Sequence, residues 1–272
     1  MSTEQPQEPA AATAYTHGYS PAVLQSMARR TAEREAGFFL PYLHPGLRVL
    51  DVGCGPGTIT LGLARAVAPG ELVGLDIDPA SVAAAEAAAR DQGVTNVRFE
   101  VGRAEALPFP DASFDAVFEH TLLEHVPDPL SVLSEMRRVL RLGGCIGLRD
   151  GDWGSNIFVP TLAPELEAAF VLYERWWRQR GGDPRLGRHQ RPLLRAAGFG
   201  RLETSAGAMI RLAPGELFAS RLTASDFVDQ VVALGWIDRP ATDRWAVGFH
   251  AWNRDPDALW ANLLFESVAW IV

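Results

Sequence analysis

Signals for strands and helices alternate without a break from about residue 47 to residue 150. The apolar run LRVLDVG is followed by TITLGLARAVA, whose apolar residues recur at helical spacing. The strand signal ELVGLDID precedes PASVAAAEAAARDQG, which has proline at the start of the predicted helix and glycine at its end, where each is favoured. This alternation predicts an α/β fold with a parallel, doubly wound sheet. Such a sheet binds its ligand at the carboxyl ends of the strands.

Polar residues stand where four of the predicted strands end. Because carboxyl ends of parallel strands meet at one edge of the sheet, these residues predict a site there. They are Asp51, Asp76, Glu119 with His120, and Arg149 with Asp150.

Three glycines follow the first strand in VLDVGCGPGT, at positions 53, 55 and 57. A dinucleotide site requires G-x-G-x-x-G, whose third glycine lets the helix approach the strand. Here the third glycine comes one place early, and Pro56 stands where the helix should begin. The spacing therefore disfavours a nicotinamide-dependent oxidoreductase.

The D-x-G-x-G-x-G spacing from Asp51 to Gly57 resembles motif I of the class I S-adenosylmethionine (SAM) methyltransferases. The segments AEALPFPDASFDAVFEHTLLEHVPDP and EMRRVLRLGG resemble the type 11 members, which include the ubiquinone and menaquinone biosynthesis methyltransferases. The resemblance covers about residues 15–150. It implies a Rossmann-like sheet that is mostly parallel with an antiparallel last strand, and SAM as the cofactor, with S-adenosylhomocysteine (SAH) as product.

The resemblance also implies roles for single residues. The glycine turn would pass under the methionine portion of SAM, Asp76 would take both ribose hydroxyls, and Ile77 would pack on adenine. Arg103 replaces an acid that usually contacts the adenine amino group, so Glu105 becomes the candidate for that contact. The candidate cofactor-binding residues are Tyr19, Asp51, Gly53, Gly55, Asp76, Ile77, Ala104, Glu105 and His120.

Methyl transfer is an in-line displacement, so positioning and exclusion of water can supply most of the catalysis. A base is required only when the acceptor must lose a proton. His120 and Asp150 are the candidates, although a packed histidine and a turn aspartate are the alternative interpretations, and His125 is expected to be structural. The candidate acceptor-binding residues are Tyr15, His17, Trp153, Trp176 and Arg188.

The second half of the chain is unlike the core and is rich in tryptophan and arginine. We expect it to cap the site and to select the acceptor. The predicted organisation is a disordered tail (1–14), an N-terminal helical lid (15–46), a SAM-binding core (47–150), helical cap insertions (151–192 and 213–255), and a closing helix and strands of the core (193–212 and 256–272).

Composition narrows the classes of partner. The formal net charge is −8, which argues against binding nucleic acid through bulk electrostatics, and RWWRQR is interpreted as part of the cap. All 25 basic residues are arginine, so lysine Schiff-base chemistry is excluded. The histidines and cysteines lack zinc-ligand spacing, so no metal is expected. The expected partner is a small-molecule acceptor, and a homodimer is left open.

Two further features concern location and redox state. No apolar run approaches the roughly 20 residues of a membrane span, and MSTEQPQEPAAATA lacks the regions of a signal peptide. We therefore expect a cytoplasmic protein. Cys54 and Cys145 are predicted at opposite edges of the sheet, too far apart for the ~7 Å limit between the Cα atoms of a disulfide.

The sequence therefore predicts a SAM-dependent methyltransferase that acts on a small, partly apolar acceptor. The alternative is a protein of the same fold that binds SAM without transferring the methyl group, as a regulator or scaffold.

Overall fold

The computed structural model of the chain describes residues 27–212 and 222–272. The predicted tail and the candidate residues Tyr15, His17 and Tyr19 lie outside the described residues.

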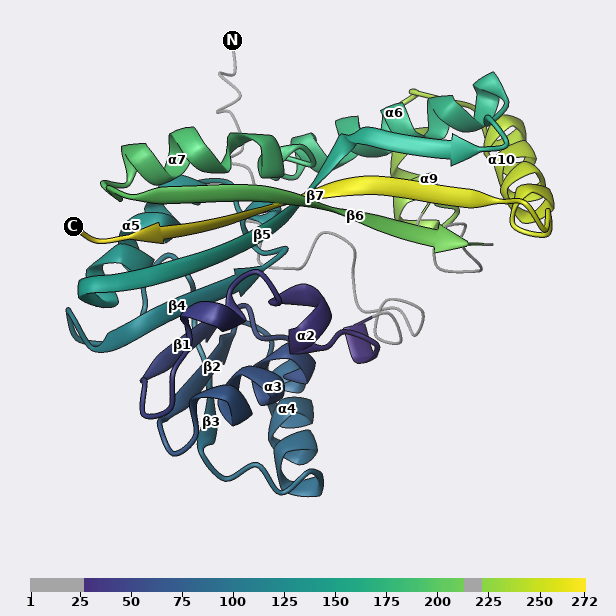
Figure 1. Cartoon of the computed structure of the whole chain (residues 1–272). Coiled ribbons are helices and arrows are strands. Elements are labelled where there is room, and N and C mark those ends of the chain that lie inside the picture. The colour runs from purple at the N-terminus through teal and green to yellow at the C-terminus, as the bar shows by residue number, and fades with distance from the viewer. Residues whose placement is uncertain (1–26, 213–221) are drawn as a thin grey trace, which may run out of the picture.

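Seven strands form one sheet in the order β3-β2-β1-β4-β5-β7-β6 (Figure 1). Neighbouring strands among β1 to β5 are parallel, whereas β7 runs antiparallel to both β5 and β6. This confirms the expected sheet with an antiparallel last strand. The strands are β1 (Val49–Val52), β2 (Leu72–Asp76), β3 (Val97–Val101), β4 (Phe114–His120), β5 (Leu140–Val159), β6 (Leu202–Leu212) and β7 (Leu259–Trp270).

The helices begin where the sequence places capping residues. Asp78 accepts hydrogen bonds from the N–H groups of Ala80 and Ser81 at the start of α4, and Asp128 accepts one from Ser131 at the start of α5. The α-helices are α2 (Ala32–Glu35), α3 (Thr58–Val67), α4 (Pro79–Asp91), α5 (Pro129–Val139), α6 (Pro164–Gln179), α7 (Gln190–Ala196), α9 (Ser225–Ala233) and α10 (Arg239–Trp252).

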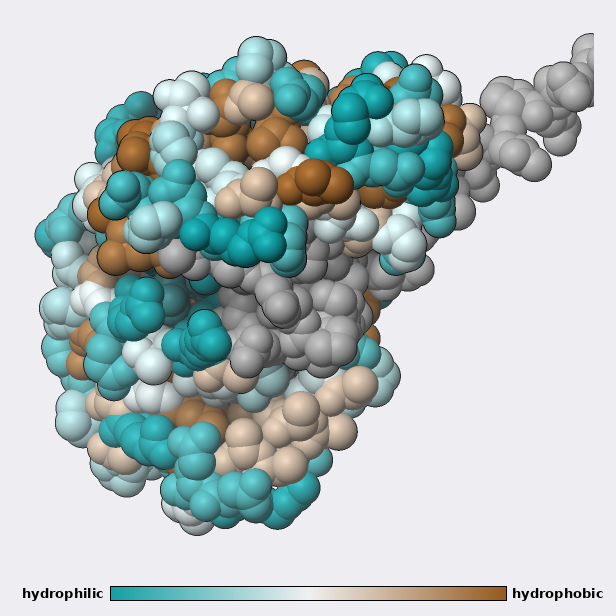
Figure 2. Space-filling view, turned by 90° about the vertical axis from the view of Figure 1, so that its right-hand side faces the viewer, coloured by the Kyte–Doolittle hydropathy of each residue, from teal (hydrophilic) through white to brown (hydrophobic). Residues whose placement is uncertain are grey.

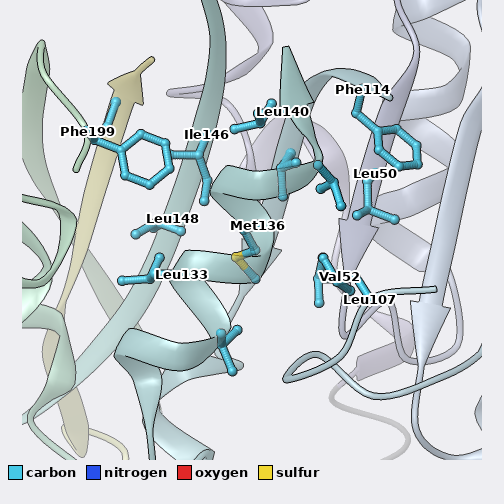
Figure 3. Packing of buried hydrophobic residues seen from close by; sticks show 14 of the residues in the cluster. Leu50, Val52, Leu107, Phe114, Leu133, Met136, Leu140, Ile146, Leu148 and Phe199 are labelled. Carbon is cyan, nitrogen blue, oxygen red and sulfur yellow. The ribbon is translucent and has the colours of Figure 1, made fainter. Parts of the chain in front are cut away.

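Both faces of the core sheet are buried. Adjacent residues of a strand point to opposite faces of the sheet, and Leu50 and Val49 of β1 do so. On one face, Leu50 belongs to the same apolar cluster as Met136 of α5 (Figure 3). On the other face Val49 and Phe118 pack with Phe39 and with α2 and α3. Parallel strands covered on both faces need near-continuous apolar runs, which explains the strand signals in the sequence.

The second half departs from the expectation in one respect. β5 continues to Val159, well beyond the end predicted near Asp150, and β7 pairs with it out to Leu259. Figure 1 shows β5, β6 and β7 running past the core to the end where α6, α9 and α10 lie. The predicted helical insertion therefore begins as strand. The register between β5 and β7 shifts between Asp152 and Ile157, which is typical of a β-bulge.

A separate apolar cluster joins these helices to the extended strands, and we call this unit the cap. It is dense in aromatic rings that contact one another, such as Trp153 stacked on Tyr173 with 5.4 Å between ring centroids. Figure 2 shows the end of the molecule that carries the cap, with separate hydrophobic areas on its upper half. The buried tryptophans of the cluster are Trp153, Trp176, Trp177, Trp245, Trp252 and Trp260.

Two further expectations concern the cysteines and the membrane. Cys54 follows β1 and Cys145 lies near the start of β5, and both are buried free thiols, as predicted. Within residues 27–212 and 222–272, no helix is long and apolar enough to cross a bilayer.

Candidate active site at the carboxyl ends of the strands

The glycine turn after β1 has backbone angles that favour glycine. The φ angles of Gly53, Gly55 and Gly57 are +78°, +52° and +78°. A Cβ on Gly57 would lie 2.9 Å from the Cβ of Ala85, so a side chain there would collide with α4. A Cβ on Gly55 would meet no atom of the described residues within 4 Å, so that peptide is open to a ligand.

A pocket lies beside this turn, along the carboxyl ends of β1, β2 and β4. Eight of the nine candidate cofactor-binding residues line it, and the ninth, Tyr19, is outside the described residues. The eight are Asp51, Gly53, Gly55, Asp76, Ile77, Ala104, Glu105 and His120. The rest of the wall includes Met27, Arg30, Leu75, Gly102, Arg103, Thr121, Leu122, His125, Val126 and Pro127.

Asp76 joins the end of β2 to the glycine turn. Its Oδ2 accepts the N–H of Gly55 at 2.8 Å, and its Oδ1 accepts the N–H of Asp78 at 2.9 Å. Each oxygen keeps a second lone pair, which can accept a hydroxyl hydrogen. Burial raises the pKa of Asp76. Ile77 next to it leaves 39% of its surface exposed at the pocket wall, a flat apolar contact suited to a base.

Asp51 is the most deeply buried carboxylate of the pocket. It is 3% exposed, and its Oδ2 accepts the hydroxyl of Thr60 at 2.6 Å. Burial, with a smaller contribution from the charge of Asp76, raises the pKa of Asp51 to about 7. A cation in the pocket would favour its ionised form.

The far end of the pocket carries the segment in which the sequence departs from the family pattern. Nη2 of Arg103 lies 3.3 Å from Oε1 of Glu105, so the two form an ion pair. Both residues line the pocket together with Ala104. The arginine that replaces the family acid therefore holds the neighbouring carboxylate at the pocket.

His120 ends β4 at the opposite end of the pocket and is surrounded by charged groups. Nη1 of Arg149 lies 3.0 Å from its Nε2, Nη1 of Arg30 lies 3.4 Å from its Nδ1, and Oε2 of Glu35 lies 3.3 Å from Nε2. Burial and the two guanidinium groups lower the pKa of His120 to about 4, although Glu35 opposes them. The imidazole is therefore neutral at pH 7.

Arg149 and Asp150 follow one another on β5 and point to opposite faces of the sheet. Arg149 forms ion pairs with Glu35 of α2 and Glu266 of β7 on the face that carries His120. Asp150 is fully buried, accepts a hydrogen bond from Gln190 at 3.0 Å, and does not line the pocket. The structure thus brings only His120 of the two candidate bases to the pocket.

The candidate acceptor residues of the second half do not line the pocket either. Trp153 is a residue of β5 rather than of a loop after it, and is 6% exposed within the cap cluster. Trp176 is 5% exposed and donates to Gln230 at 2.9 Å. Arg188 forms an ion pair with Asp152. These side chains hold the cap together in the part of the chain that the structure describes.

The cap reaches the pocket through a different residue. Trp177 of α6 stacks on His125 with 4.9 Å between ring centroids, and its Nε1 donates to the carbonyl of Glu124 at 3.0 Å. His125 lines the pocket, so it combines the expected structural role with a place in the wall.

A family model described as a methyltransferase domain matches residues 43–184, more than half of the chain. This chain belongs to that methyltransferase family. The methyltransferase is 32% identical over 279 residues to "Probable methyltransferase ltbC" of Aspergillus luteorubrus, which covers 94% of this chain and 96% of the relative.

The methyltransferase also resembles demethylmenaquinone methyltransferases over a shorter stretch. It is 44% identical over 100 residues to the demethylmenaquinone methyltransferase of Geobacillus kaustophilus, covering 36% of this chain and 43% of that one. A solved SAM-dependent methyltransferase from Aquifex aeolicus has a TM-score of 0.53 and 16% identity, covering 93% of this chain and 100% of that one, a likeness that concerns the fold. Family, fold and SAM as cofactor are thus confirmed.

Sequence reasoning missed several residues that line the pocket or contact His120. Arg30 and Glu35 belong to the segment before the core, where no motif marks them. Thr121 has a φ of +53°, which is unusual for a β-branched residue and which no sequence signal announces. The sequence marked Arg149 as a polar residue at the end of a strand, but only the tertiary structure shows that it contacts His120.

Proposed function

We propose that this methyltransferase transfers the methyl group of SAM to a small, partly apolar acceptor. One observation carries the proposal. Apolar residues of the chain segment that follows His120 stand in the pocket lining, namely Leu122, Val126 and Pro127 after β4, and Met27 lines the same pocket. An acceptor that fits there would bury apolar surface beside the neutral imidazole of His120, which would orient its polar group.

The cofactor would occupy the rest of the pocket, and the residues present fit it. Asp76 has free lone pairs for two ribose hydroxyls, the open peptide at Gly55 leaves room for the methionine portion, and Ile77 offers an apolar surface for adenine. Glu105, held by Arg103, would accept from the adenine amino group, beside the N–H of Ala104. Asp51 would lie near the positive charge of the bound SAM.

SAM supplies an electrophilic methyl group when it is bound. The chain would align the acceptor with that group and exclude water from the pocket. With its pKa near 4, His120 is a weak base at pH 7, so we assign it the role of a hydrogen-bonding partner that positions the acceptor. The acceptor atom would then be one that is nucleophilic without a strong protein base.

The experiment that tests this function uses SAM labelled in its methyl group. The protein is incubated with the labelled SAM and with fractionated cell extract, and small molecules that acquire the label are identified by mass spectrometry. We expect label in a small, partly apolar compound. Label only in protein or nucleic acid would contradict the proposed acceptor class, and tight SAH binding without any label would favour the non-transferring alternative.

A further inference from the structure

Two arginines line the described part of the pocket, and their surroundings differ. Arg103 is paired with Glu105 at one end. Arg30 lies at the other end, where Nη1 contacts Nδ1 of His120 at 3.4 Å. Among the described residues no carboxylate oxygen lies within 4.0 Å of the Arg30 guanidinium. The nearby carboxylate of Glu35 is bonded to Arg149 instead.

Arg30 therefore brings a positive charge to the pocket that the protein itself does not neutralise by a direct ion pair. A half-buried guanidinium is a strong and geometrically selective partner for a carboxylate, which it can bind through two parallel hydrogen bonds. Its neighbour His120 is neutral at pH 7 and supplies no negative charge. The site thus has the chemistry of an anion subsite.

The position of Arg30 indicates which anion it would meet. The backbone carbonyl of Met27 accepts the hydroxyl of Thr58 at 3.0 Å, and Thr58 is the first residue of α3, directly after the glycine turn. The segment that carries Arg30 is therefore fastened across the turn. Asp76, Ile77 and Glu105, which would hold the ribose and adenine, belong to the other end of the pocket.

We propose that Arg30 binds the carboxylate of the methionine portion of SAM and so fixes that end of the cofactor. The inference rests on the proposed placement of SAM in this pocket. It makes Arg30 a cofactor-binding residue, and it makes Glu35 and Arg149 positioning residues that keep the neighbouring His120 and the N-terminal segment in place.

The test compares two ligands and four proteins by calorimetry. The ligands are SAH and the decarboxylated amine analogue of SAH, which differ only in the carboxylate. The proteins are the native chain, Arg30→Gln, Arg30→Lys and the control Arg29→Gln, whose side chain is exposed and outside the pocket. Thermal melting of each variant checks that it is folded.

We expect Arg30→Gln to weaken SAH binding at least tenfold and to leave the affinity for the decarboxylated analogue within about twofold. Arg30→Lys should recover part of the loss, because it restores the charge without the fork of the guanidinium. Arg29→Gln should bind both ligands as the native chain does.

Three results would overturn the inference. Equal weakening of both ligands by Arg30→Gln would show that Arg30 acts on the structure of the pocket. Unchanged SAH binding would remove Arg30 from the cofactor site. Failure of the native chain to bind SAH would contradict the proposed cofactor site itself, a result distinct from the first two.

Discussion

Asp76 holds the glycine turn in place and, in the proposed function, also binds the ribose. Each carboxylate oxygen accepts one backbone N–H and keeps a lone pair that can accept a ribose hydroxyl, so removing the carboxylate should weaken ligand binding. Asp76→Ala should weaken SAH binding by about 1.5–3 kcal/mol, the scale of hydrogen bonds to a charged group.

Calorimetry on folded protein measures this loss. Asp91→Asn, at the exposed C-terminal end of α4, serves as the control and should bind SAH normally. An Asp76→Ala protein that melts like the native chain and keeps its affinity for SAH would exclude Asp76 from the site.

Asp51 makes stability depend on pH. Its pKa is raised to about 7 in the folded chain, above the ~3.9 of an unfolded aspartate. The folded state therefore binds the Asp51 proton more tightly than the unfolded state does. This tighter binding adds to the free energy of unfolding below about pH 4, and the added stability is lost as pH rises toward 7. Asp51→Asn, which keeps an oxygen for the hydroxyl of Thr60, should remove this loss.

The measurement is the free energy of unfolding in urea between pH 4 and pH 8, for both proteins. Other buried carboxyl groups affect the two proteins alike, so their difference isolates Asp51. We expect the variant to gain stability relative to the native chain as pH rises. A constant difference across this range would contradict the raised pKa.

At the scale of elements, the extension of β5 decides the role of Trp153. The residue lies inside a strand and packs against Tyr173 and Trp177 of α6. Trp153→Ala should therefore lower the free energy of unfolding by about 3–5 kcal/mol, as for other buried tryptophans. Affinity for SAH in the folded protein should stay within about twofold, since Trp153 does not line the pocket.

Val247→Ala, at a site on α10 that is 72% exposed, is the matched control and should leave stability nearly unchanged. Urea unfolding and calorimetry on the same samples separate the two effects. If Trp153→Ala kept its stability and lost turnover on an identified acceptor, the initial expectation of an acceptor contact would be supported instead.

For the whole molecule, the continuity of the strands joins core and cap. β6 and β7 pair in one register from Leu202 opposite Ala269 to Leu212 opposite Leu259, so the same two strands belong to both parts. Core and cap should then unfold in one cooperative transition. Tryptophan fluorescence reports mainly on the cap, and far-ultraviolet circular dichroism reports on all helices and strands.

We expect the two signals to give the same melting temperature, with SAH raising both together through binding to the folded state. Two separated transitions, of which only one responds to SAH, would show that the cap is an independent unit.

The features that the sequence determined by itself are local ones. The alternation of strand and helix signals defined the core strands and helices. Proline marked a helix start, and three glycines between the first strand and the following helix marked the turn. Most of the cofactor pocket follows from these, because parallel strands bring their carboxyl ends to one edge whatever the details of packing. Asp76 and Ile77 could be placed on this basis.

Only the tertiary structure decided the surroundings of His120 and the role of the second half. Arg30 and His120 are 90 positions apart, and Glu35 and Arg149 are 114 apart, so no local pattern connects them. The face to which Asp150 points depends on the register of β5, and the burial of Trp153 depends on where that strand ends. Contacts of this kind form because distant segments share one apolar core, and a local sequence pattern does not contain that information.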